Sequence, residues 1–121
     1  MAWKKTKGNK FYNQKTRVNG RVFDSRREAA RYRELLLCQQ AGEIRGLRFQ
    51  VPFELIPPQR YKDPRTGRYK TERGVKYIAD FCYTTRDGKS IVEDVKGVKT
   101  KEYILKRKLL LWVHRIRILE T

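Results

Sequence analysis

Apolar residues occupy every second position from Leu47 to Leu55, with charged or polar residues or Pro52 between them. A period of two over nine residues predicts a β-strand, in which the proline marks an edge or a bend. Two more runs of β-branched and aromatic residues, at 75–83 and 90–96, predict two further strands. These three segments are expected to form the centre of a sheet.

Two other segments carry helix signals. Ser25 and Glu28 have the spacing of a capping box, and an uneven apolar stripe runs from them to Gly42, a residue that often ends a helix. Thr100 can cap a second helix that continues through Trp112. Alternation returns at residues 114–119 and predicts a last strand. The expected order is therefore α-β-β-β-α-β, which belongs to the α/β class.

The segments between these elements are strongly basic. Residues 1–21 contain seven Lys or Arg and no acid, so we expect a flexible basic arm over residues 1–20. A single domain over 21–121 would follow, beginning with a short strand at 21–23. Residues 57–74 hold six Lys or Arg among prolines and glycines, which predicts either a long basic loop or a splayed hairpin.

The charge points to the class of partner. The 121 residues contain 30 Lys and Arg against 13 Asp and Glu, a formal net charge of +17. A protein of this size has room for one hydrophobic core, and so large a charge repels itself unless a polyanion binds. We therefore expect a nucleic acid as the partner. No apolar run approaches 18 residues, so no membrane partner or span is expected.

Histidine and cysteine usage excludes several kinds of site. The single histidine, His114, cannot build a His-rich zinc site and is expected to be structural. Cys38 and Cys82 lack zinc-knuckle spacing and argue against a disulfide framework, and Cys82 is expected in the core. The N-terminus shows no signal-peptide pattern, so we expect a reducing cytoplasm as the location.

Register arithmetic on the 75–96 hairpin brings acids together. A three-residue loop Arg86-Asp87-Gly88, with a left-handed glycine, would place Thr85 opposite Lys89 and therefore Asp80 opposite Asp94, with Cβ atoms about 5 Å apart. A two-residue turn at Asp87-Gly88 would instead bring Glu93 toward the face of Asp80. In the first register, Glu93 is expected to be an exposed neighbour.

Two carboxylates so close repel each other unless a cation or a proton lies between them. Mg²⁺ prefers oxygen ligands and suits a site of two carboxylates plus a substrate phosphate. Lys96 lies two residues after Asp94 and would project onto the same face. It could orient or deprotonate an attacking water, or stabilise negative charge on the phosphate.

Asp80 followed by Asp94-Val95-Lys96, on two consecutive strands before a helix, resembles the PD-(D/E)xK nuclease superfamily, with Ala79 in place of the proline. More closely, the runs Tyr77–Phe81, Asp87–Lys89 and Ile91–Gly97 are similar to small, largely uncharacterised phage and prophage proteins related to phage-type Holliday-junction resolvases. Residues 25–29 and 41–50 fit the same group. The resemblance covers roughly residues 20–119.

The resemblance implies a restriction-endonuclease-like core, with a mixed sheet flanked by helices, and Mg²⁺-dependent hydrolysis of DNA, with Mn²⁺ as a substitute. It makes Asp80, Asp94 and Lys96 catalytic residues, with both aspartates as metal ligands. In such relatives a glutamate early in the first helix completes the metal site, and Glu28 occupies that place, although its capping-box role explains it equally well. Selectivity for branched DNA, a homodimer and a bacterial host cytoplasm are further expectations of the resemblance.

Basic residues around the acids are expected to contact DNA backbones, which gives affinity with little sequence discrimination. The candidates lie in the 57–74 segment and in the second helix and its approach: Arg65, Arg68, Lys99, Lys101, Lys106 and Arg107. The alternative from a different class is a non-catalytic DNA- or RNA-binding module on a nuclease-like fold, in which the acids are structural ion pairs.

Overall fold

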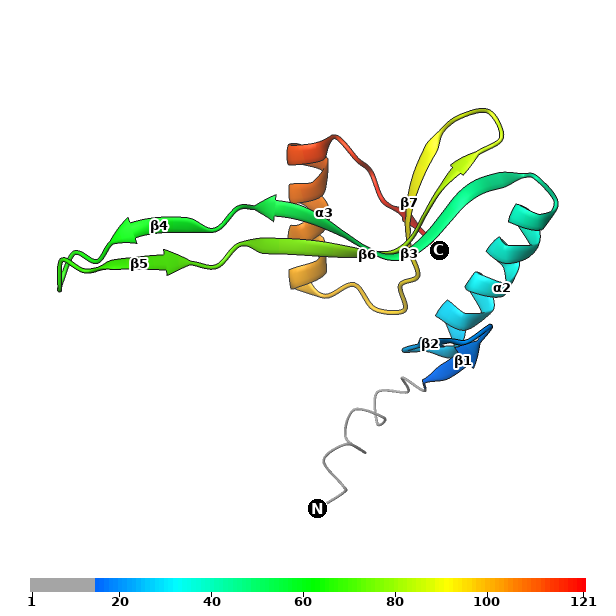
Figure 1. Ribbon diagram of the computed structural model, residues 1–121, viewed down its shortest axis with the longest axis horizontal. Helices are drawn as coiled ribbons and strands as arrows, with labels where there is room; N and C mark the ends of the chain where they lie inside the picture. Colours follow the sequence, from blue (N-terminus) through cyan, green and yellow to red (C-terminus); the bar gives the residue numbers. More distant parts are fainter. Residues whose placement is uncertain (1–14) are drawn as a thin grey trace, which may run out of the picture. The chain divides into compact units, whose positions relative to one another are not determined.

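A computed structural model describes residues 15–121 (Figure 1). They form two compact units, one of residues 15–47 with Tyr83–Ser90 and one of Arg48–Cys82 with Ile91–Thr121. The single domain expected over 21–121 stays a prediction, and each unit is described by itself. The elements are, in chain order, β1 (Thr16–Val18), β2 (Arg21–Phe23), α2 (Arg26–Gln40), β3 (Ile44–Ile56), β4 (Gln59–Lys62), β5 (Tyr69–Glu72), β6 (Val75–Thr85), β7 (Ser90–Asp94), α3 (Lys101–His114) and β8 (Leu119–Glu120).

The first unit begins with a small hairpin. β1 pairs antiparallel with β2, Val18 opposite Arg21, through a turn in which Asn19 and Gly20 both have positive φ. The strand expected at 21–23 is confirmed. The expected arm is wrong for residues 16–20, because the Asn-Gly pair supplies the turn conformation that a two-residue hairpin needs. The rest of that arm, residues 1–14, lies outside the described residues.

Helix α2 follows this hairpin and ends as the sequence indicates. The Ser25 hydroxyl oxygen accepts a hydrogen bond from the backbone N–H of Glu28 (3.1 Å), which satisfies one of the free amides of the first turn. Gly42, just past the C-cap residue Ala41, has a φ of 78° and donates its N–H to the Gln39 carbonyl. Both expected helix ends are confirmed.

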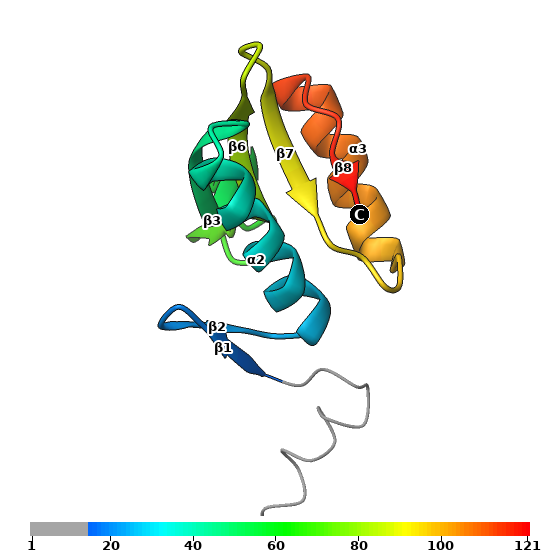
Figure 2. The ribbon, with the colours of Figure 1, turned by 90° about the vertical axis from the view of Figure 1, so that its right-hand side faces the viewer.

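The second unit contains most of a four-stranded sheet in the order β3-β6-β7-β8. β7 and β8 are parallel, whereas β6 and β7 are joined by a tight hairpin and are therefore antiparallel. Helix α3 packs against this sheet through buried Tyr103 and Leu110, and Figure 2 shows it beside β7 and β8. The core joins α3 to all the central strands: Leu55, Tyr77, Ala79, Cys82, Val92, Tyr103, Leu110 and Ile118. The α/β class with a mixed sheet is confirmed.

Between β3 and β6 the chain forms a two-stranded ribbon, β4 with β5, which extends away from α3 in Figure 1. All eight strand residues are exposed. Of the two alternatives for residues 57–74, the hairpin is therefore confirmed. A Cβ on Gly74 would lie 2.7 Å from the carbonyl oxygen of Ile56. Glycine is therefore required at the base of the ribbon, where these two segments of the chain lie side by side.

Helix α3 begins at its expected cap, since the Thr100 hydroxyl oxygen accepts from the Tyr103 N–H (3.1 Å). It ends at His114, followed by Arg115 in the left-handed conformation. The strand expected over 114–119 is wrong except at its last residue. Ile118 is buried and Ile116 half-buried, so the alternation there marks contact with the core rather than ladder pairing. His114 Nε2 donates to the Glu54 carbonyl oxygen (2.6 Å), which agrees with a structural role.

Both cysteines are free thiols, and Cys82 lies in the core as expected. Burial in apolar surroundings raises the pKa of the Cys82 thiol, so it behaves as a small apolar side chain. Among residues 15–121, neither helix has the length and apolar character needed to cross a bilayer.

Candidate active site

A cavity of about 370 Å³ lies in the second unit, where β6 and β7 meet the start of α3. Its lining combines acids, cations and two tyrosines: Lys76, Tyr77, Ile78, Asp80, Asp94, Lys96, Thr100, Glu102, Tyr103 and Lys106. Asp80, Asp94 and Lys96, which the sequence places on one surface, thus line one pocket.

Asp94 is held at the wall of this pocket with only 2 % of its surface exposed. Tyr77 donates its phenolic proton to Asp94 Oδ2. The other oxygen, Oδ1, lies 3.3 Å from Lys96 Nζ, but the geometry makes no hydrogen bond, and no donor among the described residues satisfies this buried atom. A buried acceptor without a donor costs about 1–3 kcal/mol, so this oxygen is a candidate ligand for a cation.

Tyr77 keeps its proton and therefore remains a donor. Burial is the main cause that raises the pKa of Tyr77 far above its ordinary value, and its hydrogen bond to Asp94 raises it further. Since the tyrosine fixes Oδ2, it also fixes the direction of Oδ1, which accepts no hydrogen bond. The sequence gives no sign of this contact, because the two partners are 17 positions apart.

Asp80 is anchored on the neighbouring strand. Its Oδ2 accepts a hydrogen bond from the backbone N–H of Val95 (2.8 Å), the residue between Asp94 and Lys96. The backbone of the Asp-Val-Lys segment therefore holds Asp80 next to the other two side chains. This contact brings the two acids and the lysine together without requiring that Asp80 lie directly opposite Asp94.

The hairpin that sets this register, at residues 83–90 of the first unit, has the expected three-residue loop. The Thr85 N–H donates to the Lys89 carbonyl (2.8 Å), and Gly88 has a φ of 91°. A two-residue turn at Asp87-Gly88 would not pair Thr85 with Lys89, so that alternative is wrong.

Glu93, expected to be exposed, is instead fully buried, with 0 % exposure. β8 pairs in parallel beside β7, with Leu119 opposite Glu93, so that β7 is an interior strand of the sheet. The Thr121 hydroxyl donates to Glu93 Oε2 (3.0 Å). Glu93 does not line the pocket that Asp80 and Asp94 share.

Lys96 is directed toward the pocket by an aromatic neighbour. Its Nζ lies 4.3 Å from the centroid of the Tyr103 ring, close enough for a cation–π interaction. The Tyr103 hydroxyl in turn donates to Glu120 Oε2 (2.6 Å) on β8. Lys96 is thereby placed between the Asp94 carboxylate and a fixed ring.

Glu120 anchors this side of the site. It accepts from Tyr103 and from Arg107 (2.9 Å) and pairs with Lys99 (3.1 Å). The Tyr103 hydrogen bond first, and the two cations after it, lower the pKa of Glu120 to about 2. The charged form of the Glu120 carboxylate is therefore more stable in the folded protein than in the unfolded chain.

Replacing Glu120 by Gln should lower the free energy of unfolding by about 1–3 kcal/mol at pH 7, because Arg107 loses its charged partner while only slightly exposed. The folded pKa lies below the ordinary 4.5, so the stabilisation is present above about pH 4.5 and is lost as the pH falls through about 2. Urea unfolding of both proteins across this range would measure it. Glu102→Gln, which removes only the exposed pair with Lys106, is the control and should cost under about 0.5 kcal/mol. An equal loss in the two variants, or a Glu120→Gln effect independent of pH, would contradict this assignment.

The basic residues expected to contact DNA differ in whether they pair with an acid of the protein. Lys99 and Arg107 both pair with Glu120, and Lys106 pairs with Glu102 (3.1 Å) while lining the pocket. Lys101 is exposed in the first turn of α3, and Arg65 and Arg68 are exposed in the turn of the ribbon. Lys101, Arg65 and Arg68 are therefore better placed to meet phosphates than Arg107.

Glu28 lies in the first unit, in the first turn of α2, where its backbone N–H takes part in the Ser25 cap. Its role as a third metal ligand stays a prediction. Among residues 15–121 there is no group of three or more His, Cys, Asp or Glu arranged to hold a metal. The described acids that line the pocket are Asp80, Asp94 and Glu102, and Glu102 pairs with Lys106.

A family model described as "Protein of unknown function (DUF1064)" matches residues 8–117. The chain belongs to this family. The match spans both compact units and includes every residue that lines the pocket. A search of curated proteins gave no match, and neither did a search of solved structures.

Proposed function

We propose that this DUF1064 protein is a Mg²⁺-dependent DNA endonuclease of the PD-(D/E)xK type, selective for branched or junction DNA. The observation that carries the proposal is the buried Asp94 Oδ1, which has no donor and lines one pocket with Asp80 and Lys96. Stability alone does not favour such an atom, and buried groups of this kind cluster at functional sites. The net charge of +17 supports a polyanionic substrate, and the resemblance supports branched DNA.

The residues present fit a magnesium ion. Asp80 and Asp94 provide carboxylate oxygens, the ligands that Mg²⁺ prefers, and a substrate phosphate and waters would complete an octahedron. When bound, the metal supplies charge neutralisation at the phosphate and a water that loses its proton more easily. Asp94 Oδ1 and an oxygen of Asp80 would hold it.

The chain's own groups have separate tasks in the hydrolysis, in which a water oxygen bonds to phosphorus and a phosphorus–oxygen bond of the backbone breaks. Tyr77 and the Val95 N–H fix the two carboxylates, so that the ligands are oriented before substrate arrives. Lys96 Nζ, 3.3 Å from Asp94, orients the water or stabilises the growing negative charge on the phosphate oxygens.

The proposal is tested by incubating the purified protein with linear, nicked, flap and four-way DNA of one sequence, with Mg²⁺, with Mn²⁺ and with chelator. We expect cutting of the flap or four-way substrate in either metal and none in chelator, read on denaturing gels. Asp80→Asn prepared in parallel excludes a contaminating nuclease, because it should not cut. Failure of the wild type to cut any substrate in either metal would overturn the proposal.

A non-catalytic DNA- or RNA-binding module is the second candidate. It is favoured by the fact that both acids have partners within the protein, Asp94 with Tyr77 and Lys96, and Asp80 with the Val95 amide. Such a module needs no metal, so its melting temperature should be the same in 10 mM Mg²⁺ and in chelator. The nuclease should melt higher in Mg²⁺, by about 1.4 kcal/mol of stability for a dissociation constant near 1 mM.

A further inference from the structure

The β4–β5 ribbon, residues 59–72, is ordered without a core of its own. All its strand residues are exposed, and a two-stranded hairpin with no packed face is only marginally stable in water. Its turn is held by the Asp63 N–H donating to the Arg68 carbonyl (2.8 Å) and by a 2.8 Å ion pair between Lys70 and Asp63. The fold thus maintains a protruding ribbon whose contribution to the core is small.

The register separates the ribbon into two chemically different faces. Arg60 lies opposite Thr71 and Lys62 opposite Tyr69, so these four side chains share one face, here called the Arg60 face. Gln59, Tyr61, Lys70 and Glu72 share the other, the Tyr61 face. The Arg60 face carries two cations and no acid, whereas the cation of the Tyr61 face already pairs with Asp63.

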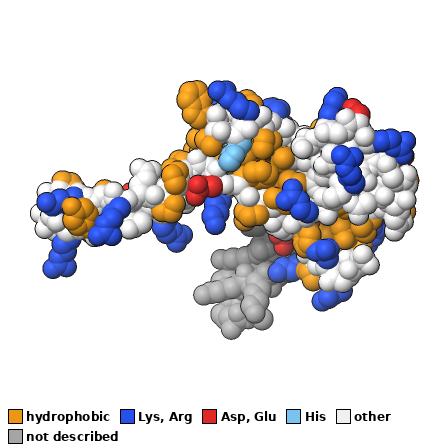
Figure 3. Space-filling view, turned by 45° about the horizontal axis from the view of Figure 1, so that its top comes forward, with side chains coloured by type: hydrophobic (Ala, Val, Ile, Leu, Met, Phe, Trp, Pro, Cys, Tyr) orange, Lys and Arg blue, Asp and Glu red, His pale blue; other side chains and the backbone are white. Residues whose placement is uncertain are grey.

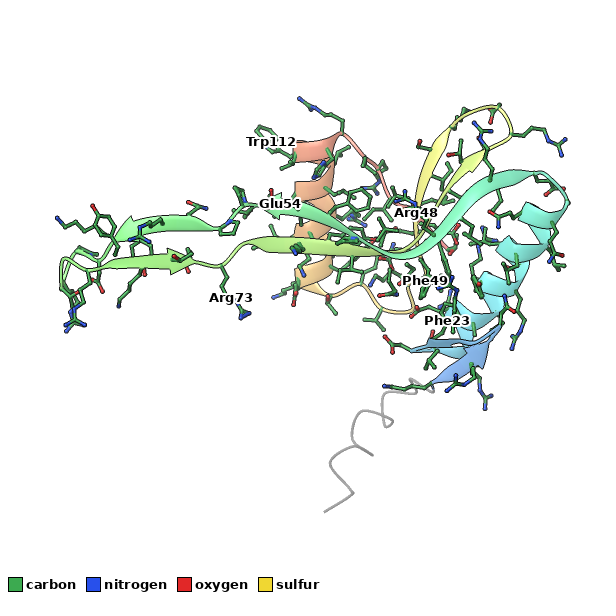
Figure 4. The ribbon with its side chains drawn as sticks, in the orientation of Figure 1. Phe23, Arg48, Phe49, Glu54, Arg73 and Trp112 are labelled. Carbon is green, nitrogen blue, oxygen red and sulfur yellow. The ribbon has the colours of Figure 1, made fainter. Side chains whose placement is uncertain are left out.

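The Arg60 face is also pre-arranged for a negatively charged ligand. The guanidinium of Arg60 lies over the Tyr69 ring, 4.8 Å from its centroid, which restricts the arginine side chain. Arg65 and Arg68 extend the same positive charge around the turn, and Figure 3 shows Lys and Arg side chains along the whole ribbon. Arg73, labelled at the base of the ribbon in Figure 4, continues the series toward β6.

The dimensions match one form of nucleic acid. A pair of strands four residues long spans about 14 Å and is about 5 Å wide between backbones. The major groove of B-DNA, about 12 Å wide, admits a two-stranded ribbon, whereas the major groove of A-form RNA is too narrow and deep for side chains to read. After Gly74 the chain continues directly into β6, and the six residues from Val75 to Asp80 span about 17 Å of strand between the ribbon and the aspartates.

We propose that the β4–β5 ribbon enters the major groove of double-stranded DNA, with Arg60 and Lys62 on the phosphates of one groove wall and Arg65 and Arg68 at the tip. The proposal rests on the proposed function only in taking nucleic acid as the ligand. The ribbon proposal adds that the ligand must include a B-form duplex arm. This arm would lie about half a helical turn from the phosphate that Asp80 and Asp94 would meet.

The test measures binding in chelator, where nothing is cut. Fluorescence anisotropy of the full chain is recorded with a 20-base-pair DNA duplex, the same DNA single strand and the matching RNA duplex, from 50 to 200 mM salt. We expect Arg60→Gln/Lys62→Gln to bind duplex DNA about 10–100-fold more weakly, with a salt slope lower by about 2, since each lost phosphate contact removes about 0.9. Both side chains are exposed, so the melting temperature should change little.

Lys70→Gln is the matched control for Lys62→Gln, because each removes one ribbon lysine, on opposite faces. We expect about 3–10-fold weaker duplex binding for Lys62→Gln and less than 3-fold for Lys70→Gln. Equal losses in the two would overturn the face assignment and leave the charges as solubilising groups of an exposed edge. Groove entry would be overturned if Arg60→Gln/Lys62→Gln lost as much affinity for single-stranded DNA or for the RNA duplex as it lost for the DNA duplex.

The inference and the proposed function can fail separately. A wild type that binds duplex DNA through the Arg60 face but cuts nothing would overturn only the nuclease. If the wild type cuts branched DNA, and Arg60→Gln/Lys62→Gln binds and cuts this DNA as well as the wild type does, only the role of the ribbon would be overturned.

Discussion

Asp94→Asn is expected to reduce Mg²⁺-dependent cutting of branched DNA by at least about a thousandfold while leaving the fold intact. The amide keeps the size of the side chain, and its oxygen can still accept the proton that Tyr77 donates to Oδ2. What is lost is the second oxygen, which would hold the cation, and the negative charge that makes it a ligand. Single-turnover cutting assays measure the loss.

Two further readouts separate this chemistry from binding. In chelator, DNA should bind Asp94→Asn as tightly as wild type or more tightly, because a negative charge near the phosphate is gone. The rise in melting temperature that Mg²⁺ gives the wild type should disappear. Without metal the variant should still fold, with a melting temperature somewhat below that of wild type, because it keeps the Tyr77 hydrogen bond but loses the ion pair with Lys96.

Glu93→Gln is the matched control, as the neighbouring residue is also a buried carboxylate changed to its amide. Its amide oxygen can still accept from the Thr121 hydroxyl, and it does not line the pocket. It should therefore retain most cutting and the full response to Mg²⁺. Loss of cutting in Glu93→Gln with retention in Asp94→Asn would contradict the assignment of the two faces of β7.

Features decided by adjacent residues could be predicted from the sequence. Ser25 and Thr100 cap their helices through amides three residues ahead, and the Gly88 loop closes between Thr85 and Lys89. The shared surface of Asp80, Asp94 and Lys96 followed from that loop, because a turn fixes the pairing of the strands it joins. The Asn19-Gly20 pair is also a known turn signal, but the basic composition around it is typical of a flexible arm.

Features that depend on pairing between distant segments could not be predicted from the sequence. Glu93 looks like the exposed member of an alternating strand until β8 pairs beside it, 26 residues further along the chain at Leu119. The Tyr77–Asp94 bond and the cluster of Tyr103 with Glu120 each join residues 17 positions apart. Neither tyrosine differs in sequence from an ordinary core aromatic, and only the fold gives its hydroxyl a carboxylate partner.

Lys96 is expected to affect cutting by a different route. Lys96→Ala should lower the rate of cutting by about 10²–10³, the loss typical of one group that stabilises charge in the transition state. Both carboxylates remain in place, so the rise in melting temperature with Mg²⁺ should survive in Lys96→Ala. In Asp80→Asn that rise should be weakened together with cutting, because a ligand has been lost.

Lys96→Met tests whether the charge or the packing of this side chain matters. Methionine keeps an unbranched stem of similar length that can lie against Tyr103, over whose ring the Lys96 ammonium sits at 4.3 Å, but it has no charge to orient water or meet a phosphate oxygen. If the charge acts in the reaction, Lys96→Met should cut as slowly as Lys96→Ala. If the lysine only packs on the ring, Lys96→Met should cut almost as fast as wild type. The catalytic role of Lys96 would then have to be abandoned, while the metal site of Asp80 and Asp94 could stand.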